Sequence, residues 1–156
     1  MGKHYSKSAA GFFDDDLHEV MPADAVVITD AVYSALLADQ AQGLIIQAGA
    51  DGVPVAVEPP PPTLAQLVAA LTTAVKAFID AAAQALGYDN ILSAISYADD
   101  ATVPAYQSQG QSLRAWRANV WKDATATLNA VSAGTTPAPT AAALILTLPV
   151  FVAPTV

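Results

Sequence analysis

The chain has 156 residues, with 14 Asp and Glu against 6 Lys and Arg, a formal net charge of -8 and no cysteine. The lack of cysteine excludes disulfides, thiolate metal sites and a cysteine nucleophile, and the acidic balance disfavours a nucleic-acid partner, because phosphate groups repel it. The most apolar stretch, residues 141–153, is interrupted by Pro149 and is shorter than the roughly 20 residues of a membrane span. We therefore expect no membrane-spanning segment, no membrane partner and no nucleic acid.

Four consecutive prolines at 59–62 separate two parts of different composition. Such a segment is stiff and extended, and it enters neither a helix interior nor a central strand. The sequence predicts an α+β fold: a small N-terminal module over 1–58, the linker over 59–62, a mainly helical region over 63–134, and a C-terminal tail with a short helix over 135–156. Nine acidic residues against two lysines precede the linker (net -7), and five against four follow it (net -1). This asymmetry indicates separate surfaces with separate partners.

The N-terminal module begins with strands and then a helix. We expect residues 5–20 to contribute one or two short strands, and the β-branched run 26–28 predicts another. Thr29 and Asp30 are candidate N-caps of a helix that follows at once. Gly43 is a suitable residue to end that helix.

A hairpin is predicted to complete the module. The apolar segments 44–46 and 53–57 flank a turn at 49–52 that is supplied by glycine and aspartate, which is typical of two antiparallel strands joined by a short loop. Pro54 has no backbone N–H to donate, so it should lie at a sheet edge or at the start of a strand.

A long helix is predicted immediately after the prolines. Thr63 and Gln66 fit a capping box, in which each side chain bonds the backbone of the other. Apolar residues then recur at spacings of three and four as far as Leu86, ahead of Gly87, and place one stripe along a helix over 64–86. The rest of its surface is mostly Ala and Thr with few charges. We therefore expect other helices or a second subunit to cover it, and we predict a homo-oligomer, a dimer, for the free protein.

Further helical segments follow in the C-terminal region. A short helix is expected near 89–97, and a longer one lies within 104–133 after a loop. Thr140 is a candidate cap of a last short helix that ends before Pro149. The predicted buried stripe of the longer helix consists of Leu113, Trp116, Val120, Trp121, Ala124, Leu128 and Val131.

No catalytic pattern emerges from the sequence. No glycine loop precedes a Lys–Ser/Thr pair, so ATP-driven chemistry is not expected. His18 follows the acidic run 14–16, which leaves a cation site open as a minor alternative to a solvated loop. Asp99 and Asp100 are adjacent and do not form a pair that faces across a scissile bond. We rank an enzyme last and expect no catalytic residue, no cofactor and no metal.

The helix predicted within 104–133 carries tryptophan and arginine in close succession. Arg114, Trp116, Arg117 and Trp121 bring guanidinium groups and indoles onto neighbouring faces. The candidate carboxylate partners of the arginines are Asp89, Asp99 and Asp100. One interpretation, the more common for such residues, places the tryptophans in the core with the arginines as structural donors. The other interpretation is a binding surface, in which these residue types are enriched.

The order and spacing of short motifs along nearly the whole chain resemble the phage tail fibre assembly family, the tail fibre chaperones. The matching motifs of the second half run from Gly87 to Ile91, from Ala94 to Tyr97, and from Arg114 to Trp121, and the segment 139–149 resembles the C-terminal end of the family. Those of the first half are Tyr5, 11–13, Pro22, Tyr33, 36–37 and 42–43, followed by 51–54. Leu44 departs from the pattern, which has a basic residue after the glycine.

The resemblance implies an ATP-independent chaperone that assists folding and trimerisation of a phage or phage-like tail fibre at its distal, C-terminal receptor-binding region. Such a protein works in the cytoplasm of the host bacterium, with retention at the fibre tip of the virion as an open alternative. The N-terminal module would bind the fibre, and the helical region would support self-association. A competing hypothesis is a permanent structural adaptor or fibre-tip subunit of the virion.

Two groups of residues carry these expectations. We expect the fibre-binding surface to include Phe12, Phe13, Tyr33, Asp51, Gly52 and Pro54. The motif residues that we assign to the core or to self-association are Tyr88, Asn90, Ile91, Tyr97, Arg114, Trp116, Arg117 and Trp121.

Overall fold

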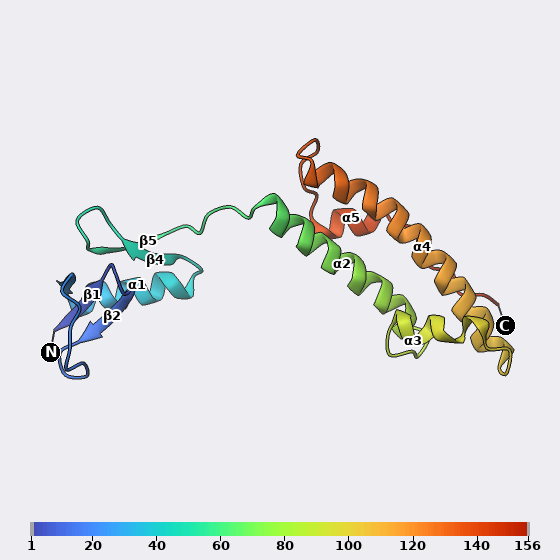
Figure 1. Cartoon of the computed structure of the whole chain (residues 1–156), viewed down its shortest axis with the longest axis horizontal. Helices are drawn as coiled ribbons and strands as arrows, with labels where there is room; N and C mark the ends of the chain where they lie inside the picture. Colours follow the sequence, from blue (N-terminus) through green and yellow to red (C-terminus); the bar gives the residue numbers. More distant parts are fainter. Residues whose placement is uncertain (1, 156) are drawn as a thin grey trace. The chain divides into compact units, whose positions relative to one another are not determined.

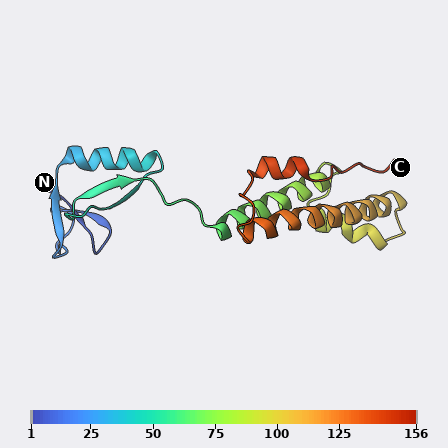
Figure 2. The ribbon, with the colours of Figure 1, turned by 90° about the horizontal axis from the view of Figure 1, so that it is seen from above.

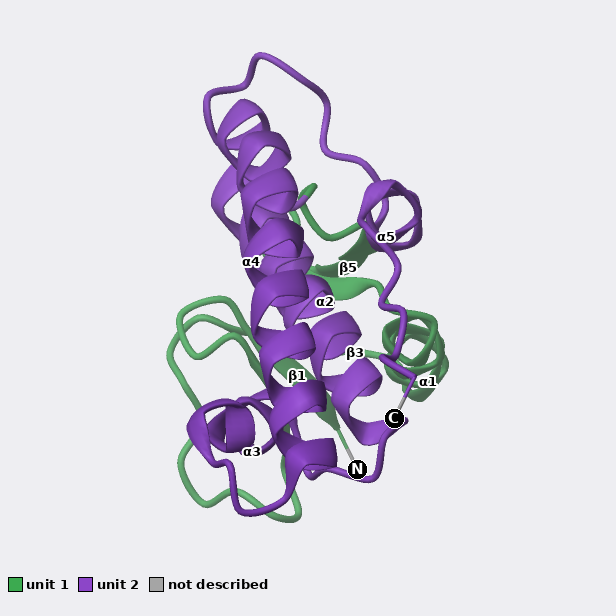
Figure 3. Ribbon diagram, turned by 90° about the vertical axis from the view of Figure 1, so that its right-hand side faces the viewer, with its two compact units in different colours: residues 1–61 green, residues 62–156 purple. Residues whose placement is uncertain are grey.

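The computed structural model describes residues 2–155, with the strands in the first part of the chain and most of the helix in the second (Figure 1). Helix accounts for 51% of the chain and strand for 13%. The α+β fold class predicted from the sequence is therefore confirmed. The chain divides into two compact units, residues 1–61 and 62–156, with the boundary inside the proline run (Figure 3).

Unit 1 begins with a three-stranded antiparallel sheet. Its strands are β1 (Lys3–Ser6), β2 (Gly11–Asp14) and β3 (Ala25–Ile28). The order β2-β1-β3 places β1 in the middle, so that Tyr5 lies opposite Phe12 on one side and Val26 on the other. The short strands expected within 5–20 and at 26–28 are confirmed, with the first strand beginning two residues earlier than expected.

Helix α1 (Asp30–Ala41) has the caps that the sequence predicts. The hydroxyl of Thr29 accepts a hydrogen bond from the backbone N–H of Val32 at 3.2 Å. At the other end the chain turns through Gly43, whose φ of 95° is a left-handed conformation that glycine adopts without steric cost.

The predicted hairpin is present as β4 (Ile45–Ala48) and β5 (Pro54–Val57), which form a separate two-stranded antiparallel sheet. Its loop spans 49–53, one residue more than expected, and the carboxylate of Asp51 accepts a hydrogen bond from the backbone N–H of Val53. Pro54 is the first residue of β5, as predicted. Helix α1 packs against this sheet.

Unit 2 is a helical assembly. Its elements are α2 (Leu64–Gln84), α3 (Ile91–Ser96), the short 3-10 helix η1 (Tyr97–Asp99), α4 (Pro104–Ser132) and α5 (Ala141–Thr147). Helices α2 and α4 run antiparallel and side by side, and α5 packs against α2 (Figures 1 and 2). The expected short helix near 89–97, the long helix within 104–133 and the final helix capped by Thr140 are all confirmed.

The ends of α2 follow from local sequence signals. Both hydrogen bonds of the capping box between Thr63 and Gln66 are present. At the C-terminal end the N–H of Tyr88 donates to the carbonyl of Ala83 and that of Gly87 to Gln84, with a φ of 91° at Gly87. This is the bond pattern of a Schellman motif, so the helix ends where glycine permits a left-handed turn.

The interior of unit 2 is one continuous apolar cluster. Its buried members are Leu71, Val75, Ile79, Ala83, Ile91, Ala94, Leu113, Trp116, Val120, Ala124, Val131, Leu144 and Leu148. The stripe predicted for α4 is confirmed at Leu113, Trp116, Val120, Ala124 and Val131. Trp121 and Leu128 are only half-buried, but they pack against the cluster, so the prediction holds in part for them.

Helices α3 and α4 cross closely at Gly110. A Cβ atom on Gly110 would lie 2.8 Å from the backbone nitrogen of Ala98 and 2.9 Å from the carbonyl oxygen of Ala94. Any side chain would force these backbones apart, so glycine sets the distance between the two segments.

The expectation of no membrane-spanning segment stays a prediction, because within residues 2–155 α2 alone matches a membrane span by length and composition. Among the described residues, this helix is long and apolar enough to cross a membrane. An 18-residue segment of it has a mean hydropathy of 1.4, and 17% of that segment is buried. Its alanine-rich sequence carries only Lys76 and Asp80 as charges. One such helix is weak evidence for a membrane, because a core helix of a soluble protein passes the same test.

Candidate functional site

An aromatic cluster on unit 1 joins two of the predicted fibre-binding residues. Phe12 of β2 and Tyr33 of α1 meet edge to face with ring centroids 4.9 Å apart, and Tyr5 of β1 contacts Phe12 in the same way at 5.3 Å. The ammonium group of Lys3 lies 5.3 Å from the centre of the Tyr33 ring. Tyr5 is buried, whereas Phe12 and Tyr33 are half-buried, so part of this cluster is accessible to a partner.

Phe13 does not belong to this cluster. It stacks edge to face against His18, with centroids 5.1 Å apart. Successive side chains of a strand point to opposite faces, so Phe12 and Phe13 cannot both join the cluster with Tyr33. The predicted fibre-binding surface is therefore divided between two faces of β2.

The acidic run 14–16 is part of the structure of unit 1. Asp14 is buried and forms an ion pair with Lys3. The hydrogen bond from Lys3 and a second one from the backbone N–H of Asp16 lower the pKa of Asp14, and the same pairing raises the pKa of Lys3. Within residues 2–155 no group of three His, Asp or Glu side chains is placed to hold a metal ion.

Asp24 braces the turn between β1 and β2, a role that the sequence analysis missed. Its carboxylate accepts hydrogen bonds from the hydroxyl of Ser6 at 2.7 Å and from the backbone N–H and hydroxyl of Ser8 at 2.7 and 2.8 Å. These bonds favour the ionised form and lower the pKa of Asp24 to about 2. The donors lie 16 and 18 residues from Asp24 in the sequence, and no local sequence pattern indicates this pairing.

The hairpin residues of the predicted surface differ in accessibility. Asp51 is exposed at the tip, and Gly52 has a φ of 85°. A side chain on Gly52 would come within 3.6 Å of Val26, which places the tip beside β3. Pro54 is buried at the start of β5, so it is not available for direct contact with a partner.

Unit 1 leaves a considerable amount of apolar surface exposed. Its exposed large apolar residues are Leu17, Val20, Val27, Val32, Leu37, Ile45, Val53 and Val55. Val27, on strand β3, is 73% exposed. Strands β2 and β3 form the two edges of the first sheet, and β4 and β5 each pair on one side only among the described residues. Unit 1 therefore offers both apolar side chains and strand edges.

The motif residues of unit 2 that precede α4 are mostly structural. Asn90 caps α3, with its side-chain oxygen accepting hydrogen bonds from the backbone N–H groups of residues 92 and 93. Ile91 is buried, and its N–H donates to the carboxylate of Asp80 at 3.0 Å. Tyr88 donates from its hydroxyl to Gln109 at 2.7 Å, and burial raises the pKa of Tyr88.

Three tyrosines contact one another where the segment before α3, the 3-10 helix η1 and the start of α4 come together. The ring of Tyr88 contacts both Tyr97 and Tyr106, which also contact each other at 5.5 Å between centroids. Tyr97 and Tyr106 are exposed. Tyr106 was not among the predicted site residues, because it lies at the start of α4 and outside the motifs.

Of the four tryptophan and arginine residues on α4, two are structural. Trp116 is 8% exposed, and its indole N–H donates to the carbonyl of Pro149 at 2.7 Å, while its ring packs against Phe151. Arg114 forms a bidentate pair with Asp99 at 3.0 and 3.1 Å. The interpretation of core tryptophan and structural arginine is confirmed for Trp116 and Arg114.

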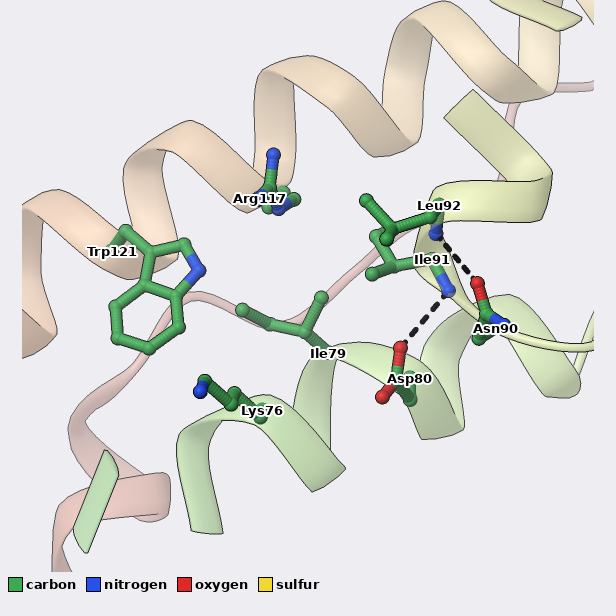
Figure 4. Close-up of a pocket in the computed structure, with 8 residues that line it drawn as sticks. All are labelled: Lys76, Ile79, Asp80, Asn90, Ile91, Leu92, Arg117 and Trp121. Carbon is green, nitrogen blue, oxygen red and sulfur yellow. Dashed lines mark hydrogen bonds between the residues drawn. The ribbon is translucent and has the colours of Figure 1, made fainter. Parts of the chain in front are cut away.

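The other two residues line a pocket. Trp121 and Arg117 of α4 face Lys76 of α2 across a cavity of about 380 Å³ whose wall also includes Ile79 and Leu92 (Figure 4). Trp116 and Trp121 are separated by five residues, which is about 140° around a helix. The two indoles therefore cannot share one face, and this spacing could have predicted their different environments.

Comparisons with protein-family models, with curated proteins and with solved structures found no match to this chain.

Proposed function

We propose that the chain is an ATP-independent chaperone that assists the folding and trimerisation of a phage or phage-like tail fibre in the host bacterial cytoplasm. Unit 1 binds the distal, C-terminal region of the fibre protein. The observation that supports this proposal is the surface of unit 1, which combines strand edges with exposed apolar residues such as Val27 and the half-buried pair Phe12 and Tyr33. The motif resemblance supplies the identity of the partner.

The physical basis of such an activity is the slow assembly of the client. Trimeric fibres are rich in strand pairing between distant segments, so unassembled chains expose edges and apolar patches for a long time and aggregate. An extended segment can add to a free strand edge of another protein through main-chain hydrogen bonds, with side-chain contacts giving specificity. Unit 1 has the edges and the apolar contacts for this kind of binding, and the mechanism needs no nucleotide.

The decisive experiment is co-expression of the fibre gene from the same phage or prophage with and without this chain. We expect more soluble, SDS-resistant fibre trimer when the chain is present. Co-elution of the chain with the trimer on size exclusion would distinguish a retained subunit from a released chaperone. Equal amounts of trimer in both cases would contradict chaperone activity and favour the permanent adaptor or fibre-tip subunit.

A matched pair of variants locates the binding surface. Val27→Asp places a charge on an edge strand of unit 1, and Leu146→Asp makes the same change at a residue of unit 2 that is 87% exposed. Both variants should fold, which circular dichroism can verify, because neither side chain is buried. We expect Val27→Asp to abolish most of the gain in trimer and Leu146→Asp to leave it intact. Equal behaviour of the two variants would remove unit 1 from the proposal.

Self-association through α2 is the second part of the proposal. One stripe of this helix is buried, while residues on its other side such as Ala69, Thr73 and Ala77 are exposed and uncharged. Small side chains allow a second helix to approach closely. We expect light scattering to show a dimer at micromolar concentration and Thr73→Glu to convert it to a monomer. The control is Thr125→Glu, at an exposed position of α4. A monomeric wild-type chain would contradict this part without affecting the fibre assay.

A further inference from the structure

A pocket on unit 2 places one cation on each of two facing helices, with apolar wall between them. It has a volume of about 380 Å³, at the lower end of the range for ligand sites. Lys76 comes from α2, Arg117 and Trp121 come from α4, and Ile79 and Leu92 supply apolar wall (Figure 4). Because Arg117 and Trp121 are four residues apart on one helix, they occupy the same face.

Neither cation of the pocket has a partner among the described residues. Within residues 2–155, Lys76 and Arg117 take part in no ion pair and no side-chain hydrogen bond. Asp80 lies one turn from Lys76 on α2, but its carboxylate accepts the backbone N–H of Ile91 instead (Figure 4). In contrast, Arg114 on the same helix as Arg117 is held by Asp99 in a bidentate pair.

The charges and walls of the pocket select the kind of ligand. Lys76 and Arg117 against Asp80 give the pocket a net charge of +1, in a chain of net charge -8. A guanidinium group matches a carboxylate in a planar, bidentate geometry, and the indole of Trp121 with Leu92 offers apolar contact next to it. Because Asp80 offsets one of the two cations, a single carboxylate neutralises the pocket, whereas a doubly charged phosphate would make its net charge negative.

We infer that this pocket is a docking site for a peptide segment of another protein, one that places an Asp or Glu side chain beside an apolar side chain. The carboxylate binds Arg117 and Lys76, and the apolar neighbour packs on Trp121 and Leu92. This inference goes beyond the proposed fibre interaction and does not rest on it, because it follows from unit 2 alone.

The test is a selection of displayed random peptides on the full-length chain. We expect the enriched peptides to share an acidic residue next to an aliphatic or aromatic one. The affinity of a synthetic copy should fall about tenfold or more in Lys76→Gln/Arg117→Gln, as for the loss of a charged hydrogen bond. The matched control is Arg114→Gln/Lys122→Gln, which removes the same charge from α4 outside the pocket and should leave the affinity unchanged.

Several outcomes would overturn the inference. These are a failure to enrich any peptide, enriched peptides without an acidic residue, and an equal loss of affinity in the control variant. Displacement of the peptide by inorganic phosphate at constant ionic strength would assign the pocket to phosphate. A selected motif that matches the sequence of the chain itself, together with a dimer that dissociates in Lys76→Gln/Arg117→Gln, would make a second copy the occupant.

The fluorescence of Trp121 gives an independent measurement. Because the indole lines the pocket, the synthetic peptide should change its emission in a saturable manner, and a Trp116→Phe background isolates that signal. The same peptide with Gln in place of the acidic residue should bind about tenfold more weakly. Equal binding of the two peptides would exclude a role for the carboxylate.

Discussion

Units 1 and 2 are stabilised by different interactions. Unit 2 has a continuous apolar cluster along α2 and α4, closed by α3 and α5. Among residues 2–61 the buried side chains are Tyr5, Ser6, Asp14, Ile28, Leu36 and Pro54, which include two polar ones. Hydrogen bonds and an ion pair contribute more visibly there, as in the brace around Asp24 and the pair of Lys3 with Asp14.

Because of this difference, we expect the stability of unit 1 to depend more on pH and on binding partners than that of unit 2. Burial of apolar side chains depends little on pH, whereas an ionised hydrogen-bond acceptor stabilises only while it is charged. A unit with a small interior and exposed apolar surface also gains more, relative to its own stability, from a partner that binds only the folded form. We therefore expect unit 2 to remain folded under acidic conditions that unfold unit 1.

The largest effect is expected for Trp116→Ala. This change removes the packing against Phe78 and Phe151 and the hydrogen bond to Pro149, and it should lower the free energy of unfolding of unit 2 by about 3–5 kcal/mol. Urea unfolding followed by the helical circular dichroism signal measures this loss. Trp121→Ala is the matched control and should cost clearly less, because Trp121 is only half-buried; equal losses would contradict the assigned core.

Gly110→Ala should have the next largest effect. Alanine is the better helix former by about 1 kcal/mol, so at an open position the change would stabilise α4. Here the added Cβ would meet the backbones of Ala94 and Ala98, and we expect a net destabilisation of unit 2 of about 1–3 kcal/mol. A gain in unfolding temperature by calorimetry would show that the α3–α4 crossing has room for a methyl group.

A smaller, pH-dependent effect is expected from Asp24 in unit 1. Its pKa in the folded state is about 2, against an ordinary value of 3.8. The stabilisation is therefore fully present above about pH 4 and is lost as the pH falls through the folded pKa. NMR signals of unit 1 should report unfolding in this window before those of unit 2. Asp24→Asn should reduce the pH dependence, and an unchanged acid transition in this variant would contradict the role of the brace.

The smallest effect is expected for Arg114→Gln. Its pair with Asp99 is bidentate, but both side chains are exposed, and solvent screens such pairs. The hydrogen bond from Arg114 lowers the pKa of Asp99, so titration of that carboxyl by NMR should move upward in the variant while the unfolding temperature hardly changes. A loss as large as that of Gly110→Ala would mean that the pair holds η1 against α4.

Local signals explain which parts of the fold were predictable. The capping box at Thr63 and Gln66 and the turn at Gly87 depend on residues close in sequence, and both ends of α2 were found. The strand order β2-β1-β3 depends on pairing between distant segments, and short strands carry no signal that determines their neighbours. The elements of unit 1 were therefore predictable from the sequence, but the arrangement of its sheet was not.

The candidate sites were predictable only in part for the same reason. Alternation along β2 could have separated Phe12 from Phe13, and the helical spacing could have separated Trp116 from Trp121. The pocket between α2 and α4 was not predictable. Lys76 and Arg117 are 41 positions apart in the sequence, and only the register of the two antiparallel helices brings them together. The brace at Asp24 likewise joins segments that only the folded sheet brings together.

Because of the positions of the two tryptophans, the intrinsic tryptophan fluorescence of the chain reports on one unit only. Both lie in α4, so tryptophan emission excited at the red edge of the absorption band comes from unit 2 alone. It does not report on changes in unit 1. Trp116 sits in an apolar setting and reports whether the helices hold together, while Trp121 at the pocket senses local quenching. Unfolding should therefore change the emission of both tryptophans, whereas binding at the pocket should change mainly that of Trp121, which the Trp116→Phe variant isolates.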